Sequence, residues 1–100
     1  MAGFVQIIQY KTSKFDDMQK LIDKFREQTA GRRTTTRGMV CRDRDNANTY
    51  MSIVEFPSYD DAMKNNDLPE TAALAQEMQK LADGPPTFYN LDVVDDREMS

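Results

Sequence analysis

The sequence contains no histidine, no tryptophan and a single cysteine, Cys41. One cysteine cannot form an internal disulfide, and a lone thiol fits a protein of the reducing cytoplasm. The absence of histidine removes the most common metal ligand and the usual activator of a nucleophilic cysteine. We therefore expect no metal site, and we expect Cys41 to be a packed strand residue.

Long apolar runs and an excess of positive charge are also missing. No segment approaches the roughly 20 consecutive apolar residues that cross a bilayer, and residues 1–5 lack the basic and apolar regions of a signal peptide. The formal net charge is −4, which argues against nucleic acid or an anionic membrane as a partner.

The chain is 100 residues long, which is near the most common size of one domain. It contains no linker, repeat or low-complexity segment, so we expect a single domain over residues 1–100 with a polar tail at residues 95–100. Asp and Asn at residues 43–48 are typical of a tight turn. Segments rich in β-branched and aromatic residues predict four strands, at residues 4–11, 34–42, 49–56 and 88–94.

Apolar residues at helical spacing predict two longer helices. The first has an N-cap at residues 12–13 and ends near Gly31. The second has Asp67 as N-cap and Glu70 at the capping-box position, and a short helix capped by Ser58 precedes it. The apolar stripes are Phe15, Met18, Leu21, Ile22 and Phe25 in the first helix, and Leu74, Ala75, Met78, Leu81 and Ala82 in the second.

This order of elements, βαββαβ, is that of the ferredoxin-like α+β fold, in which the helices cover one face of a four-stranded antiparallel sheet. The strands at 4–11 and 49–56 carry apolar residues on both faces. Phe4, Tyr10, Tyr50 and Phe56 share one face of their strands, and Val5, Ile7, Met51 and Ile53 lie on the other. An apolar face left uncovered usually marks an interface. We therefore predict a homodimer in which two sheets pack face to face as an α+β barrel.

The run at residues 54–62, VEFPSYDDA, resembles the strand-to-helix segment of the antibiotic-biosynthesis-monooxygenase family. The resemblance extends over nearly the whole chain in length and element order, and it implies the dimeric α+β barrel of that family. Phe56 stands where the family often has tryptophan, and Asn65 and Asn66 fall near its histidine. Haem-degrading members use that histidine to bind iron, so haem degradation is disfavoured. The quinol- and polyketide-oxidising members need neither metal nor flavin, and we expect no cofactor.

The resemblance implies a pocket between helices and sheet that holds a small aromatic or hydrophobic ligand. Such a pocket needs polar groups where a substrate anion forms and aromatic walls for a flat ring. The candidate residues are Gln6, Asn65 and Asn66 for catalysis, and Arg37, Phe56, Tyr59 and Tyr89 for substrate binding.

Two functions remain open at this point. One is a cofactor-independent monooxygenase that acts on a small aromatic, quinol or polyketide-type substrate. The other is a non-catalytic protein of the same fold that binds a small ligand or serves as a dimerisation module, which the missing tryptophan and histidine favour.

Charged residues also leave two interpretations open. Glu55 is an unusual charge for a central strand, and we expect it to pair with an arginine near the dimer seam or to act as a base.

Five arginines concentrate positive charge in an acidic chain; they either recognise an acidic substrate or form a solvated rim that pairs with Asp43, Asp45 and the tail. These arginines are Arg32, Arg33, Arg37, Arg42 and Arg44.

Overall fold

The computed structural model describes residues 3–99. The predicted domain and its tail also include Met1, Ala2 and Ser100, which lie outside the described residues. Seven elements follow one another in the predicted order, with the short helix between the third strand and the last long helix. Their bounds are β1 Phe4–Lys11, α1 Phe15–Gln28, β2 Arg37–Arg42, β3 Thr49–Phe56, α2 Tyr59–Asn66, α3 Pro69–Leu81 and β4 Thr87–Asp92.

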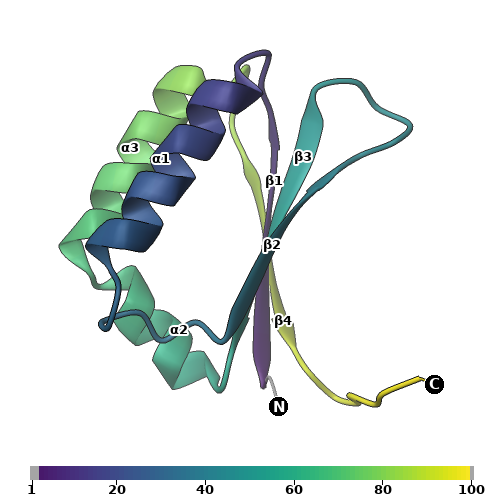
Figure 1. Cartoon of the computed structure of the whole chain (residues 1–100). Helices are drawn as coiled ribbons and strands as arrows, with labels where there is room; N and C mark the ends of the chain where they lie inside the picture. Colours follow the sequence, from purple (N-terminus) through teal and green to yellow (C-terminus); the bar gives the residue numbers. More distant parts are fainter. Residues whose placement is uncertain (1–2, 100) are drawn as a thin grey trace.

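The four strands form one sheet in the order β2-β3-β1-β4, and all neighbouring pairs are antiparallel. Figure 1 shows α1 and α3 side by side along one face of this sheet, with α2 at one end of the same side. No element of residues 3–99 covers the other face. The predicted ferredoxin-like fold is therefore confirmed, while the dimeric barrel requires a second chain and stays a prediction.

Strand register divides the side chains between a covered face and an uncovered face. Phe4 pairs with Phe56 and Tyr10 with Tyr50, and all four side chains are buried toward the helices. Residues of the other parity point away, because successive side chains of a strand alternate. The uncovered face carries Val5, Ile7, Met39, Cys41, Met51, Ile53, Tyr89 and Leu91. Cys41, which we expected to be packed, is exposed on this face.

Two buried clusters hold the helices against the covered face. One joins the sheet to α2 and the other joins it to α1. In the second cluster the Phe15 ring stacks on Tyr50 with their centroids 4.2 Å apart. The clusters consist of Phe4, Phe56 and Ala62, and of Tyr10, Met18 and Tyr50.

The predicted helix caps are partly wrong. Ser58 does cap α2, because its Oγ accepts a hydrogen bond from the Asp61 amide. The N-cap of α1 is Lys14, however, and the Thr12 hydroxyl instead donates to the Leu81 carbonyl at 2.7 Å. Asp67 is the C-cap of α2 rather than the N-cap of α3. The Thr12 Oγ1 also accepts a hydrogen bond from the Lys14 amide at 3.0 Å, so it binds the N-cap residue instead of capping the helix itself. The N-cap of α3 is Leu68, one residue after the predicted position.

Two predicted strands are shorter than expected. β2 begins at Arg37 rather than at residue 34, because the residues before it bind α2 and the edge of β3: the Thr34 hydroxyl donates to the Asp61 carbonyl at 2.5 Å. β4 ends at Asp92 rather than at residue 94. The predicted turn between β2 and β3 is present, with Asn48 at a φ of 60°, a conformation that asparagine tolerates.

Candidate functional site

A cavity of about 470 Å³ lies between α1, the segment that follows it, and the covered face at β2 and β3. Its volume is within the range of small-molecule sites, and it is partly open to solvent. The lining residues are Ile22, Phe25, Arg26, Gly31, Arg33, Thr35, Thr36, Arg37, Gly38, Met39, Val40, Ser52 and Val54.

Apolar side chains and a few hydroxyl groups make up most of this lining. Ile22 and Phe25 come from the predicted apolar stripe of α1, and Val54 faces them from β3. Ser52 adds a hydroxyl group on the same side of β3. Such a cavity can hold a flat apolar ring and can donate a hydrogen bond to an oxygen on it.

Positive charge is the other feature of the lining. Arg26 comes from the last turn of α1, Arg33 from the segment after it, and Arg37 from the start of β2. Among the residues that the structure describes, no aspartate or glutamate lines the cavity. The Arg37 guanidinium pairs loosely with Glu55, with Nε and Oε2 3.8 Å apart.

Helix α2 supports the wall of the cavity through Asn65. The Asn65 side-chain carbonyl accepts a hydrogen bond from the Thr34 amide at 3.4 Å, beside the lining residues Arg33 and Thr35. Asn65 is buried, whereas the next residue, Asn66, is exposed. Of the two predicted asparagines, only Asn65 therefore points inward, next to the cavity.

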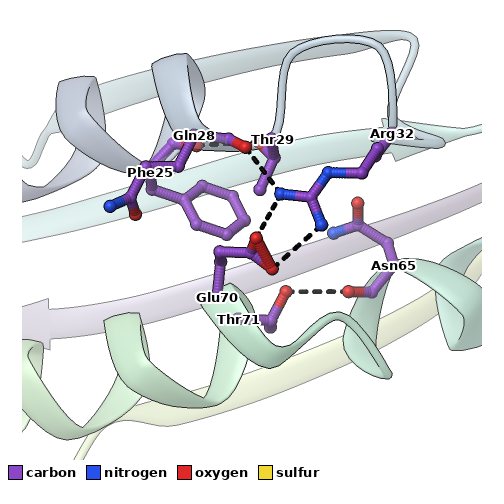
Figure 2. Close-up of polar contacts among 7 residues, drawn as sticks. All are labelled: Phe25, Gln28, Thr29, Arg32, Asn65, Glu70 and Thr71. Carbon is purple, nitrogen blue, oxygen red and sulfur yellow. Dashed lines mark hydrogen bonds and ion pairs between the residues drawn. The ribbon is translucent and has the colours of Figure 1, made fainter.

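An ion pair joins the segment after α1 to the first turn of α3 (Figure 2). Arg32 donates to both carboxylate oxygens of Glu70 and to the Gln28 carbonyl at the end of α1. Hydrogen bonding from Arg32 lowers the pKa of Glu70 below its ordinary value. The Thr71 hydroxyl donates to the Asn65 backbone carbonyl at 2.7 Å, so α3 is tied to α2 at the same point. Glu70 thus does not act as the capping-box residue that we predicted.

The remaining predicted catalytic residue, Gln6, lies on the covered face one strand away from the cavity. Its register partner on β3 is Val54, which lines the cavity. The Gln6 amide donates to the Asn90 side chain on β4 at 3.3 Å. Gln6 is therefore near the cavity but is not one of its lining residues.

Three of the four predicted substrate-binding residues lie elsewhere. Phe56 is 1% exposed and belongs to the core cluster with Phe4. Tyr59 is 55% exposed at the start of α2 and packs edge-on against Phe4. Tyr89 lies on the uncovered face, where its hydroxyl donates to Gln9 at 3.3 Å. Only Arg37 of this set borders the cavity.

The charged residues separate into different environments. Glu55 pairs with an arginine, as predicted, and the partner is Arg37 across β2 and β3. Register puts both residues on the uncovered face. Arg37 nevertheless borders the cavity at the start of β2, whereas Glu55 is not among the lining residues, where a base would have to be. Arg32 binds Glu70 rather than Asp43 or Asp45.

Sequence reasoning missed Ser52 and Tyr10 as polar groups of the covered face. The Tyr10 hydroxyl is buried and has no hydrogen-bond partner among residues 3–99. Burial raises the pKa of Tyr10, and the nearby Ser52 side chain opposes part of that rise. Strand parity could have predicted Ser52 on the covered face, because it lies between Tyr50 and Val54 in the series of every second residue that shares one face of β3.

No group of three potential metal ligands lies together within residues 3–99. In the same stretch, none of the helices combines the length and apolar character needed to cross a membrane.

No protein-family model and no curated protein matches this sequence. Solved structures do match the fold. SnoaB from Streptomyces nogalater, a cofactor-independent oxygenase in the form of an asparagine-to-alanine mutant, has a TM-score of 0.81 at 12% identity over 96% of this chain and 97% of its own. A conserved protein from Methanosarcina mazei has a TM-score of 0.80 at 10% identity, over 92% and 93%. A candidate antibiotic biosynthesis monooxygenase from Caulobacter crescentus has a TM-score of 0.79 at 15% identity, over 94% and 92%.

At these identities the likeness concerns the fold. It extends over almost the full length of both chains. The chain therefore has the ferredoxin-like α+β fold of the antibiotic biosynthesis monooxygenase structures, which the resemblance in its sequence predicted.

Proposed function

We propose that this protein is a cofactor-independent oxygenase that acts as a homodimer on a small aromatic, quinol or polyketide-type substrate. The observation that carries the proposal is the cavity of about 470 Å³ between α1 and the sheet, in a fold shared with the oxygenase SnoaB. The single cysteine, Cys41, fits a cytoplasmic setting.

The cavity offers what such chemistry requires of a protein. An electron-rich phenol or quinol must lose a proton to water at the open side of the cavity. Its anion then transfers one electron to dioxygen, which gives a substrate radical and superoxide, and these two combine. The protein has to exclude water from the ring and stabilise the anion. Ile22, Phe25 and Val54 supply an apolar wall, and Ser52 supplies a hydrogen-bond donor beside it.

Asn65 and Gln6 are the polar groups that we propose to act near the substrate. Asn65 is buried beside the cavity wall, and Gln6 lies next to Val54 on the covered face. A neutral amide stabilises an anion through its N–H donors without taking up a proton itself. Asn66 is exposed and provides a matched control.

The homodimer is proposed from the uncovered face. It presents Ile7 and Ile53 as register partners at its centre, and Met39, Tyr89 and Leu91 are exposed around them. A second copy related by a two-fold axis would cover both apolar faces at once.

A non-catalytic ligand-binding protein is the second candidate. One observation favours it: the Asn65 side-chain carbonyl already binds the Thr34 amide, so this residue has a structural role without any substrate. In this case the cavity would bind a small aromatic molecule without oxidising it.

Oxygen uptake with a panel of hydroquinones and anthrones separates the two candidates. We expect uptake above that of buffer for the unmodified protein. Asn65→Ala should lower the rate by about tenfold or more, because one lost hydrogen bond to a developing charge has at least this effect. Asn66→Ala should stay within about twofold. No uptake with any substrate would reject the oxygenase and leave the ligand-binding protein.

A further inference from the structure

The charge of the cavity is opposite to that of the chain. The chain has 17 acidic and 13 basic residues, yet three arginines and no carboxylate line the cavity. The charged residues of the lining are therefore all of one sign.

The arginines around the cavity differ in how far they are already neutralised. Arg32, just outside the lining, is fully engaged with Glu70. Arg37 has Glu55 as a distant partner. Arg26 and Arg33, by contrast, form no ion pair with any acidic residue between 3 and 99. Two guanidinium groups of the lining are therefore without a protein counter-charge.

Arg33 is the more informative of the two. Arg26 lies in the last turn of α1, where a cation is favourable because of the helix dipole. Arg33 lies beyond the end of α1 and is only partly exposed, so the helix end does not account for its charge at the cavity. A partly desolvated guanidinium favours an anion with which it can form two parallel hydrogen bonds.

We propose that the ligand of this cavity is a flat aromatic anion whose carboxylate binds Arg33, with Arg26 as the second cation. The ring would lie against Ile22, Phe25 and Val54, on the apolar side of the same cavity. This inference rests on the proposed function for the location of the site, and it adds the charge class of the substrate.

Two fluorescent probes of nearly equal shape test the inference: 9-anthracenecarboxylate and the neutral 9-anthracenemethanol, each titrated into the full-length protein without turnover. We expect the carboxylate to bind about tenfold more tightly, the effect of a hydrogen bond to a charged group. Arg33→Gln should remove most of this preference, and Arg26→Gln should remove a smaller part. The affinity for the alcohol should be unchanged in both variants.

Arg44→Gln is the matched control, because Arg44 is exposed in the turn between β2 and β3 and does not line the cavity. Equal affinity for the two probes, no binding of either probe, or equal losses in Arg33→Gln and Arg44→Gln would overturn the inference. Oxygen uptake from neutral quinols without charge preference would reject it and keep the oxygenase. Charge-selective binding without oxygen uptake would support it and reject the oxygenase.

Discussion

The two faces of the sheet are built from alternate residues of the same strands, and they differ in how far their apolar side chains are buried. On the covered face, Phe4, Tyr10, Tyr50 and Phe56 are buried under the helices. On the uncovered face, side chains of similar apolar character, such as Tyr89 at 42%, remain exposed. Similar side chains therefore serve folding on one face and are available for association on the other.

Polar groups differ between the faces as well. The covered face holds Ser52, which lines the cavity, and the buried Tyr10 hydroxyl, which has no hydrogen-bond partner within residues 3–99. The uncovered face holds the cross-strand pair Arg37–Glu55 and the Tyr89–Gln9 hydrogen bond, both formed among its own residues. Chemistry is consequently expected on the covered face and dimerisation on the uncovered face.

The largest expected effect is on the covered face. Phe56→Ala empties a site that is 1% exposed and in contact with Phe4 and Ala62. It should lower the free energy of unfolding by about 3–5 kcal/mol, measured by urea denaturation. Val94→Ala, at a side chain 95% exposed, should change it by less than about 0.5 kcal/mol. Similar effects at both positions would contradict the division between core and surface.

An intermediate effect is expected on the uncovered face. Ile53→Asp places a carboxylate at its centre, opposite Ile7, where a second copy would desolvate it without a partner. The dimer should weaken by about 100-fold or more, so light scattering at micromolar concentration should report one 11.5 kDa chain in place of two.

The matched control for this change is Gln79→Asp, at an exposed position of α3, which should leave the dimer intact. Circular dichroism checks that both variants remain folded. A single 11.5 kDa chain for the unmodified protein, or a dimer that survives Ile53→Asp, would reject the homodimer.

The smallest effect is expected in the helical layer above the covered face. Arg32 lowers the pKa of Glu70, so the folded state binds a proton there less readily than the unfolded chain. The stabilisation is present above the ordinary glutamate pKa, about 4.3, and disappears as the pH falls through the lower pKa of the folded state. Glu70→Gln should lower the Tm slightly at pH 7, by a few degrees at most.

Thermal melts from neutral pH to about pH 3 measure this difference. The Tm values of the unmodified protein and Glu70→Gln should converge as the pH falls. Glu98→Gln, in the exposed tail, should show no such convergence. A constant difference across the pH range would mean that Glu70 stabilises the fold without its charge.

Much of the fold could be predicted from local patterns. The strand at 49–56 was predicted with its observed bounds, and the apolar stripe of α1 includes Met18, which is buried, and Ile22 and Phe25, which line the cavity. These predictions succeed because side-chain periods of 2 and 3.6 residues are properties of one segment. The cap at Thr12 was wrong because α1 begins after Lys14. The Thr12 hydroxyl accepts from the Lys14 amide and donates to the Leu81 carbonyl, and the second of these contacts is distant in the sequence.

The candidate site was less predictable. Sequence proximity placed Asn65 and Asn66 together, but the helix turns one inward and the other outward. Tyr89 and Arg37 were grouped with Gln6 although they belong to the opposite parity of the sheet. Ser52 and Arg33 both line the cavity. Strand parity could have indicated Ser52, and Arg33 was one of five arginines for which two interpretations stayed open.

The sequence by itself determined the order and type of the elements, and it determined that the sheet has two apolar faces. Both follow from composition and spacing within short segments, where sterics and hydrophobicity act locally. Only the tertiary structure decided that Arg32 binds Glu70 while Arg33 is left beside the cavity. That choice depends on where the end of α1 meets α3 and β2, because a charge is neutralised by whichever group the folded chain brings within a few ångströms of it.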